Sequence, residues 1–387
     1  MSSSLRFWLG WGIGLALLWL SLAWGLAQWN LNNYQQLVSD RLVLLGELRR
    51  GALQEYFATA DAELRFWSSN PEMIRSQAAL RDIWESEPGD SAGARLRRDY
   101  IDNNPNPAGY YLDYDGADDG SAYGALHLQM HPRTRLLVTE RDYYDFFLIG
   151  PGGDVYYSVE KEADFATNLE TGEWRDTGLA QVYQRAKRER NEGTVAISDM
   201  MPYGPSKGEP AMFLATAMHD EGGQFLGVIA FQLPTDRILG IMAYTSGMGE
   251  TGETYLVGQD RLMRSDSRFS QESTVLRRRV ETPMVERALA GEQGVEFTAD
   301  YRDVDVISAY LPVTVGDTRW AIMAEIDQQE IAVGAARERP SLSGLLALFY
   351  GLSLWSVWYW RGRPGPEEGV QVAGLDFDEG SGSGFSE

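Results

Sequence analysis

The sequence contains no cysteine and only three histidines among its 387 residues. Without thiols the chain can form neither a disulfide framework nor a thiolate metal site, so its folding relies on burial alone. Basic residues are also few, since 34 lysines and arginines stand against 56 acidic residues and give a formal net charge of −22. A surface of this sign repels the phosphate backbone, which argues against nucleic acid as a partner.

Common signatures of catalysis and metal binding are scarce as well. The sequence has neither a Walker-type phosphate loop nor an HExxH zinc motif. His127 and His131 are four residues apart, as metal ligands on a helix can be, but no third ligand accompanies them. The acidic segments 102–104 and 113–119 lack the spacing of an EF-hand. We therefore predict a protein that is not an enzyme and that has no cofactor and no metal site.

Two long apolar runs without charge lie near the two ends of the chain, Phe7 to Trp29 and Ser341 to Trp360. Roughly 20 apolar residues cross a bilayer as a helix, and tryptophan is enriched at the membrane interface. We predict two transmembrane helices, at 7–29 and 341–360, in contact with the lipid of a bacterial inner membrane. The alternatives are a cleaved signal peptide, with Gly25 and Ala27 before the cut, and a buried core helix.

Basic residues near the runs predict the orientation of the chain. Arg6 precedes the first run and Arg361 follows the second, although Arg337 lies at the opposite end of the second run. We expect residues 1–6 and a short disordered tail, 361–387, in the cytoplasm. The part between the runs is then periplasmic or extracellular.

The segment after the first run is predicted to be a stalk helix over residues 30–70. Its apolar residues recur at three- and four-residue spacing, and we expect these to form one stripe: Leu42, Leu45, Leu48, Leu53, Tyr56 and Phe57. A second helix is predicted over residues 70–100, with Pro71 in its first turn.

From Tyr143 the pattern changes to short strands, and this pattern repeats. The runs YYDFFLIGPGGDVYYSV and GETYLVGQDRLMRSDS both predict hairpins, about 108 residues apart. GTVAISD and GVEFTAD match in the same way, and two further strands follow each of them. We predict an α+β fold with two antiparallel sheets of about five strands each. They form a membrane-distal module at 71–240 and a membrane-proximal module at 241–335.

A stalk helix that leads into two PAS-like sheets between two membrane spans resembles the double Cache (dCache) sensor domain. Three segments carry the resemblance: YYDFFLIGPGGDVYYSVEKEADFATNL, GTVAISDMMPYGPSKGEPAMFLATAM and GMGETGETYLVGQDRLMRSDSRF. It covers residues 30–335 and both spans. Such domains form the extracytoplasmic part of bacterial chemoreceptors, sensor kinases and cyclic-nucleotide-turnover proteins, so the resemblance implies recognition of a small molecule.

The resemblance places the ligand in the first module, between the sheet and the segment that joins the hairpin to the next strand. By position this segment runs from Asp164 to Trp174, includes Asn168, and faces Asp199 and Tyr203. Members that bind amino acids have an Arg-x-Trp-Tyr cluster in this segment. This chain has Trp174 followed by arginine instead.

An amine ligand would need Asp199 as a counter-charge and an aromatic wall, for which we name Tyr144, Tyr157, Trp174 and Tyr203. The alternative is that the tyrosines belong to the core or rim of a sheet and that Asp199 caps a turn. In the second copy, the segment from Arg264 to Arg268 is suited to clamp an anion. We favour a structural role for it, in bonding the proximal module to the stalk helix.

Members of this family normally continue into a signalling module, whereas only residues 361–387 follow the second run. We therefore expect a membrane-anchored sensor, homodimeric through its stalk helix, that signals through a separate protein. The alternative is a non-catalytic accessory subunit of a membrane assembly that uses the Cache fold for protein–protein contact. The sequence leaves the ligand, the partner and the oligomeric state open.

Overall fold

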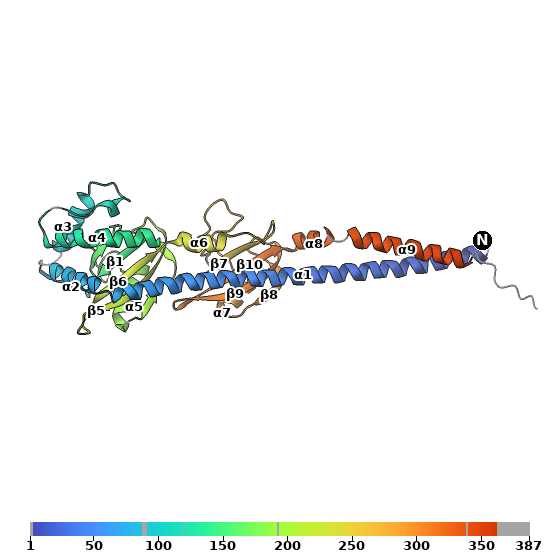
Figure 1. The fold of residues 1–387 in the computed structure, drawn as a ribbon, viewed down its shortest axis with the longest axis horizontal. Helices are drawn as coiled ribbons and strands as arrows, with labels where there is room; N and C mark the ends of the chain where they lie inside the picture. Colours follow the sequence, from blue (N-terminus) through green and yellow to red (C-terminus); the bar gives the residue numbers. More distant parts are fainter. Residues whose placement is uncertain (1–2, 87–90, 118, 192, 338–339, 362–387) are drawn as a thin grey trace, which may run out of the picture. The chain divides into compact units, whose positions relative to one another are not determined.

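The computed structural model describes residues 3–86, 91–117, 119–191, 193–337 and 340–361 (Figure 1). The chain divides into two compact units, one of residues 1–33 with 334–387 and the other of residues 34–333. The second unit holds both sheets. Its helices and antiparallel sheets confirm the predicted α+β class.

Helix α1 (Ser3–Ser68) is continuous and belongs to both units. Within the second unit one face of α1 is buried against the sheets, through Val38, Leu42, Leu53, Phe57 and Leu64. The opposite face is exposed and carries Leu37, Leu44, Leu48 and Phe66. The prediction that Leu48 shares one stripe with Leu42 is wrong, because at about 100° per residue the two lie roughly 120° apart around the helix, and Leu48 is exposed.

The segment predicted as one helix over 70–100 contains three elements instead. They are α2 (Pro71–Ser86), α3 (Ser91–Arg97) and the π-helical turn η1 (Arg98–Asp102). Asn70 caps α2, since its Oδ1 accepts from the backbone N–H of Glu72 at 2.9 Å. The short turn η2 (Tyr111–Asp113) and helix α4 (Ala122–Arg141) follow.

The distal sheet has the strand order β2-β1-β6-β5-β3, with β4 paired to β5. Its strands are β1 (Asp145–Ile149), β2 (Val155–Ser158), β3 (Val195–Ile197), β4 (Met201–Tyr203), β5 (Glu209–His219) and β6 (Phe225–Leu233). Alternate side chains of β1 point to opposite faces. Phe146 and Leu148 enter the core shared with α1, α2 and α4, whereas Phe147 and Ile149 enter the core under α5 (Gly178–Glu189).

Helix α6 (Thr235–Ala243) leads to the proximal sheet, which has the order β7-β10-β9-β8. Its elements are β7 (Glu253–Val257), α7 (Pro283–Ala290), β8 (Gly294–Ala299), β9 (Asp305–Val315) and β10 (Thr318–Asp327). This order repeats β1-β6-β5-β3 of the distal sheet, as the internal repeat predicts. The sheets have six and four strands, where about five each were predicted. Strand β4 adds one to the distal sheet, and the chain after β7 forms only isolated bridges in the proximal one.

Helices α8 (Gln328–Arg337) and α9 (Pro340–Arg361) end the described chain. In the first unit the ring of Trp19 on α1 stacks on Phe349 of α9, with centroids 6.4 Å apart. Among the described residues α1 is long and apolar enough to cross a membrane, whereas the apolar stretch Gly344–Tyr359 is shorter. Two membrane spans are therefore not confirmed. The predicted disordered tail lies outside the described residues from 362 onward.

Candidate functional site

The distal module contains a cleft of about 580 Å³. Its walls come from residues 97–111, 160–163 and 205–209 together with Tyr144. Charged side chains of both signs line it, namely Arg97, Glu160, Lys161, Glu162, Lys207 and Glu209. A cleft of this size and polarity suits a small polar molecule.

A cluster of polar side chains adjoins the cleft through Glu162 and Ser206. The hydroxyl of Tyr144 donates to Glu162 at 2.8 Å, and that of Ser206 donates to the other oxygen of Glu162 at 2.5 Å. Ser206 in turn accepts from the Gln232 amide at 3.4 Å. We call the following group the distal polar cluster: Asp145, Glu162, Asp164, Tyr203, Ser206 and Gln232.

Tyr203 and Trp174 fix the segment that follows the hairpin. The hydroxyl of Tyr203, at the end of β4, donates to Oδ2 of Asp164, and both side chains are fully buried. The Trp174 indole donates to the carbonyl of Ala163 at 3.2 Å. Its ring lies against Gly204, where any Cβ would collide with it, so only glycine allows this approach.

Three buried oxygens of the distal polar cluster accept no hydrogen bond from the described residues. They are Oδ2 of Asp145, Oδ1 of Asp164 and Oε1 of Gln232. Asp145 and Gln232 are partners across β1 and β6. Buried polar atoms are normally paired, so three acceptors without donors next to one cleft call for a functional explanation.

Burial changes the protonation of this cluster. Desolvation, and then the charges of Glu160 and Asp164, raise the pKa of Asp145 well above its usual value. Desolvation likewise raises the pKa of Asp164 to about 7, although the Tyr203 hydrogen bond acts in the opposite direction. The pKa of Glu160 also rises to about 7, through burial and the neighbouring Glu162. Carboxyl groups here therefore change charge near neutral pH.

Lys161 lines the cleft, but its ammonium group points to the α4 side of the sheet. Its Nζ donates to the carbonyl of Val159 at 3.2 Å and lies 3.5 Å from Nδ1 of His131. Burial lowers the pKa of Lys161 to about 7. The lysine therefore does not neutralise the three unpaired acceptors by direct contact.

The histidine pair is part of the core on this side. The rings of His127 and His131 stack with centroids 4.5 Å apart. Both nitrogens of His131 are used, by the hydroxyl of Tyr157 at 2.6 Å and the carbonyl of Leu112 at 2.8 Å. Burial and the charge of Lys161 lower the pKa of both histidines, so they are neutral side chains that hold α4 in place.

Of the residues predicted for the ligand site, Tyr144 lines the cleft. Asp164, Trp174 and Tyr203 lie behind its wall, where Tyr203 bonds to Asp164 and Trp174 bonds to the wall residue Ala163. Tyr157 lies instead beneath α4, bonded to His131 and Thr134. Asn168 braces the hairpin turn, where its side-chain amide donates to the carbonyl of Gly152 and to Asp154, each at 2.9 Å. These placements leave ligand contact by any of them a prediction.

Asp199 lies away from the distal polar cluster, in contact with the proximal module. Its two oxygens accept from Nε and Nη2 of Arg264 at 3.1 and 3.0 Å, and one also accepts from the Trp320 indole at 2.9 Å. The structural role predicted for Arg264 is present, but the partner is wrong. Arg264 bonds to the distal module, because the β7 turn faces the end of β3 and not the stalk helix.

Sequence reasoning missed Asp145, Gln232, Glu162 and Ser206. A signal was available for the first two, since each is a polar residue at or next to the end of an otherwise apolar strand, DFFLI and FLGVIAFQL.

Residues 204–208 read Gly-Pro-Ser-Lys-Gly, the spacing of a hydrolase nucleophile motif. That motif needs a turn from strand to helix, whereas this segment joins strand β4 to strand β5. Ser206 is therefore a wall residue of the cleft.

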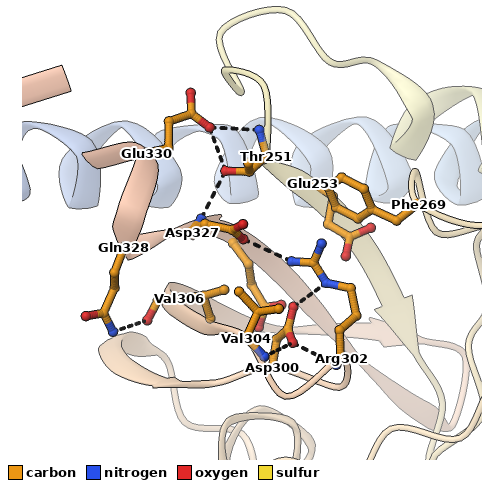
Figure 2. Close-up of polar contacts among 12 residues, drawn as sticks. Thr251, Glu253, Phe269, Asp300, Arg302, Val304, Val306, Asp327, Gln328 and Glu330 are labelled. Atoms are coloured by element: carbon orange, nitrogen blue, oxygen red, sulfur yellow. Dashed lines mark hydrogen bonds and ion pairs between the residues drawn. The ribbon is translucent and has the colours of Figure 1, made fainter. Parts of the chain in front are cut away.

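The proximal module holds an acidic group at the same place in its sheet. Oxygens of Glu253, Asp300 and Glu325 lie within 4.8 Å of one another, and all three residues are buried. Figure 2 shows how Asp300 bonds to Arg302, which also reaches Asp327 at 3.1 Å. A metal ion would have to displace bonds of this kind, because every carboxylate oxygen of the group already accepts one. The donors include Tyr255, Ser267, Tyr301, Arg302 and Ser308.

The sequence profile of the Cache domain family, in its double (dCache) form, matches residues 53–335. A search of curated proteins finds no match. The matched region contains both sheets, the cleft and the acidic group of the proximal module.

Solved structures with a similar fold include three sensor domains. The ligand-binding domain of the Pseudomonas fluorescens chemoreceptor CtaA with L-leucine is 13% identical (78% of this chain, 96% of that one, TM-score 0.41). The sensory domain of the Campylobacter jejuni chemoreceptor Tlp3 is 12% identical (79% and 99%, TM-score 0.44). The extracellular domain of the putative histidine kinase vpHK1S-Z8 is 8% identical (79% and 95%, TM-score 0.47).

Proposed function

Because the chain belongs to the double Cache domain family, we propose that it is an extracytoplasmic sensor that binds a small molecule in the distal cleft. The proposed distal module spans residues 71–240 and the proximal module 241–335. No catalytic step is proposed. Ser206 is bonded to Glu162 and to Gln232 as part of the distal polar cluster.

The ligand proposed is a small organic cation that carries an ammonium group. The observation that carries this proposal is the set of unpaired acceptors on Asp145, Asp164 and Gln232. All three are at least 97% buried, and all three need donors. An ammonium group supplies three N–H donors and a positive charge for the neighbouring carboxylates. Arg97 and Lys207 line the same cleft, so α-amino acids are the nearest competing class.

A thermal-shift screen of the detergent-solubilised chain tests this function. The panel comprises primary amines, α-amino acids and organic acids. A ligand at 100 times its Kd adds about 2.7 kcal/mol to the free energy of unfolding. We expect primary amines to stabilise the wild type and to lose this effect in Asp164→Asn.

Asp176→Asn is the matched control, because the Asp176 side chain is 87% exposed in the same module. It should leave the stabilisation unchanged. Organic acids that stabilise the protein while amines do not would contradict the ligand class. No stabilisation by any compound would favour the accessory-subunit function.

Membrane attachment and dimerisation are proposed as parts of the same function. Residues 7–29 and 341–360 are the proposed spans, with both ends of the chain in the cytoplasm. Because the chain has no cysteine, a single introduced thiol reports its own location. Ser270→Cys in whole cells should react with a membrane-impermeant maleimide, whereas Ser4→Cys should react only after lysis. The reverse pattern would contradict the orientation.

A homodimer through α1 is proposed from its exposed apolar stripe, Leu37, Leu44, Leu48 and Phe66. These residues lie on the face opposite the sheets, and burial of such a face against a second copy removes apolar area from water. Leu44→Cys should therefore form a disulfide-linked dimer on oxidation. Leu42→Cys, at a position only 1% exposed, is the control that should not. A dimer passes its signal to a separate membrane or cytoplasmic protein, which is the remaining part of the proposal.

A further inference from the structure

The segment Ser198–Tyr203 joins the candidate site to the proximal module, and we call it the strap. At one end, Tyr203 donates to Asp164 in the distal polar cluster. At the other end, Asp199 is bonded to Arg264 and Trp320. We propose that the strap transmits the state of the distal site to the proximal module, with Asp199 as its positioning residue. This inference rests on the proposed function, since it assigns the regulation of the same site.

The proximal end of this connection is rigid. Arg264 is 1% exposed, and its guanidinium presents two parallel donors to the carboxylate of Asp199. The third nitrogen bonds the carbonyl of Leu262 and the Asp260 carboxylate, each at 3.0 Å. Gly258 lies against the guanidinium, where any Cβ would collide with it. A shift of Asp199 must therefore move the β7 turn with it or break the ion pair.

Trp320 extends the connection to the strand that leaves the module. Its indole is fully buried and donates to Asp199, and its ring meets Phe57 of α1 edge to face at 6.2 Å. Trp320 belongs to β10, which ends at Asp327, where α8 begins without a break. Glu330 ties the start of α8 to the backbone and hydroxyl of Thr251, as Figure 2 shows. The strap therefore contacts the strand that runs into α8.

A neighbouring contact holds the two modules together independently of Asp199. Arg185 of α5 pairs with Asp317 at 2.5 Å and donates to the carbonyl of Ile197 at 3.0 Å. Gly316, in the left-handed backbone region, packs against Ile197. Loss of the Asp199 contacts should therefore loosen the coupling while the modules stay joined. This separates the role of Asp199 from simple adhesion.

Hydrogen exchange of the full chain in detergent tests the proposal without any ligand. Tyr203→Phe removes the bond to Asp164 and so disturbs the distal end of the strap. We expect several-fold faster exchange in peptides of β7 and β10 in this variant. In an Asp199→Ala background, Tyr203→Phe should add no further change in those peptides, because the bonds to Arg264 and Trp320 are already lost.

Tyr183→Phe is the matched control. Tyr183 is buried in the same core, but its hydroxyl donates to Pro151 and Glu170 and not to the strap. Tyr183→Phe should leave hydrogen exchange in the peptides of β7 and β10 as it is in the wild type. If Asp199→Ala does not fold, Asp199→Asn replaces it, since this change keeps one oxygen acceptor but removes the charge that pairs with Arg264.

The proposal is wrong if Tyr203→Phe leaves exchange in β7 and β10 unchanged, or changes it equally when Asp199 is replaced. Neither result depends on finding a ligand. A ligand screen without stabilisation would contradict the proposed function and leave this coupling standing. Conversely, a confirmed amine ligand together with unchanged exchange would overturn the coupling alone.

Discussion

The two modules carry polar residues at the same point of their sheets, but the acceptors of these residues all have donors in only one of the modules. Asp145 pairs with Gln232 across β1 and β6, and Glu253 pairs with Glu325 across β7 and β10. In the proximal module every carboxylate oxygen of this pair accepts a hydrogen bond. In the distal module Asp145 and Gln232 each keep a buried acceptor without a donor. A buried polar group whose acceptors all have donors is a structural element, whereas a group with unpaired acceptors is a candidate site.

The missing donors can be traced to two positions. Tyr255, two residues after Glu253, donates to Glu325 at 3.0 Å, and the residue two after Asp145 is Phe147. Ser308, the cross-strand partner of Glu325, donates to it at 2.7 Å. The corresponding partner of Gln232 is Phe213. Two hydroxyl donors of one copy are thus phenylalanines in the other, which is why only the distal copy needs donors from outside.

The largest expected effect is on the free energy of unfolding, and it comes from Glu325 in the acidic group of the proximal module. Burial raises the pKa of Glu325 from 4.5 to about 7. Between these values the native state keeps a proton that the unfolded state has lost, so the free energy of unfolding falls as pH rises from about 4.5 to about 7. The fall from this residue is about 3 kcal/mol. Urea titrations across this range should show a shallower fall in Glu325→Gln.

Glu281→Gln is the control for that experiment, because Glu281 is 61% exposed. It should keep the pH dependence of the wild type. A pH profile of Glu325→Gln identical to that of the wild type would show that the acidic group does not hold the proton.

The second effect concerns the joint between the modules. Asp199→Ala leaves Arg264 without its main partner in a buried place, and removal of one partner of a buried pair is strongly destabilising. Because the Asp199 side chain is 32% exposed and Asp260 still contacts Arg264, we expect the free energy of unfolding to fall by about 2 kcal/mol. This is less than the loss expected for a fully buried pair. Denaturant unfolding measures it.

Asp260→Ala is the matched variant at the same arginine. The Asp260 side chain is 48% exposed, so its loss should cost less than about 1 kcal/mol. Equal losses in the two variants would mean that the inter-module pair has no special weight.

The third effect concerns the distal site itself. The pKa of Asp164 is raised to about 7 by burial, so at lower pH a cation must displace its proton. The affinity for a primary amine should therefore fall as pH drops below 7, by up to about tenfold per pH unit. Isothermal titration at pH 6, 7 and 8 measures this. Affinity that rises on acidification would contradict a cation at Asp164.

The smallest expected effect comes from removing one donor from the acidic group of the proximal module. This group then has an unpaired acceptor, as the distal polar cluster does. Tyr255→Phe removes the donor to Glu325 and leaves a buried acceptor unpaired, at an expected loss of about 1 kcal/mol. Tyr310→Phe is the control, because Tyr310 lies in the same core and its hydroxyl makes no hydrogen bond within the described part of the chain. Thermal unfolding of both variants checks the difference. Equal midpoints would show that Tyr255 does not close the group.

Much of the fold could be predicted from local pattern. The strand alternation and glycine-rich turns of the two copies indicated both hairpins, and the matching segments at 193–199 and 294–300 became the edge strands β3 and β8. The hairpin after β7 was overestimated, since its second strand forms only isolated bridges. Arg264, in this second strand, bonds to Asp199 of the distal module, a contact that local pattern does not reveal.

The candidate site was only partly predictable. The family resemblance led to Asp164, Trp174 and Tyr203, which the structure brings together, and also to Asp199, which it joins to Arg264. The local sequence does not show which residue each aspartate will meet, since Asp164 follows a charged segment and Asp199 a short apolar one, yet both find partners distant in sequence. The partner of Asp199 lies 65 residues away in the sequence, and such pairing depends on how two modules pack.

The sequence by itself determined the elements of this protein: an uncharged apolar run continued by a helix, two copies of one sheet, and a chain without thiols. These follow from side-chain periodicity and composition, which act between near neighbours. Only the tertiary structure decided which buried acids are satisfied and which remain open. Asp145 and Gln232 meet across strands far apart in the chain, and Asp164 meets Tyr203. Hydrogen bonding depends on such meetings, since a donor acts only within about 3 Å of its acceptor.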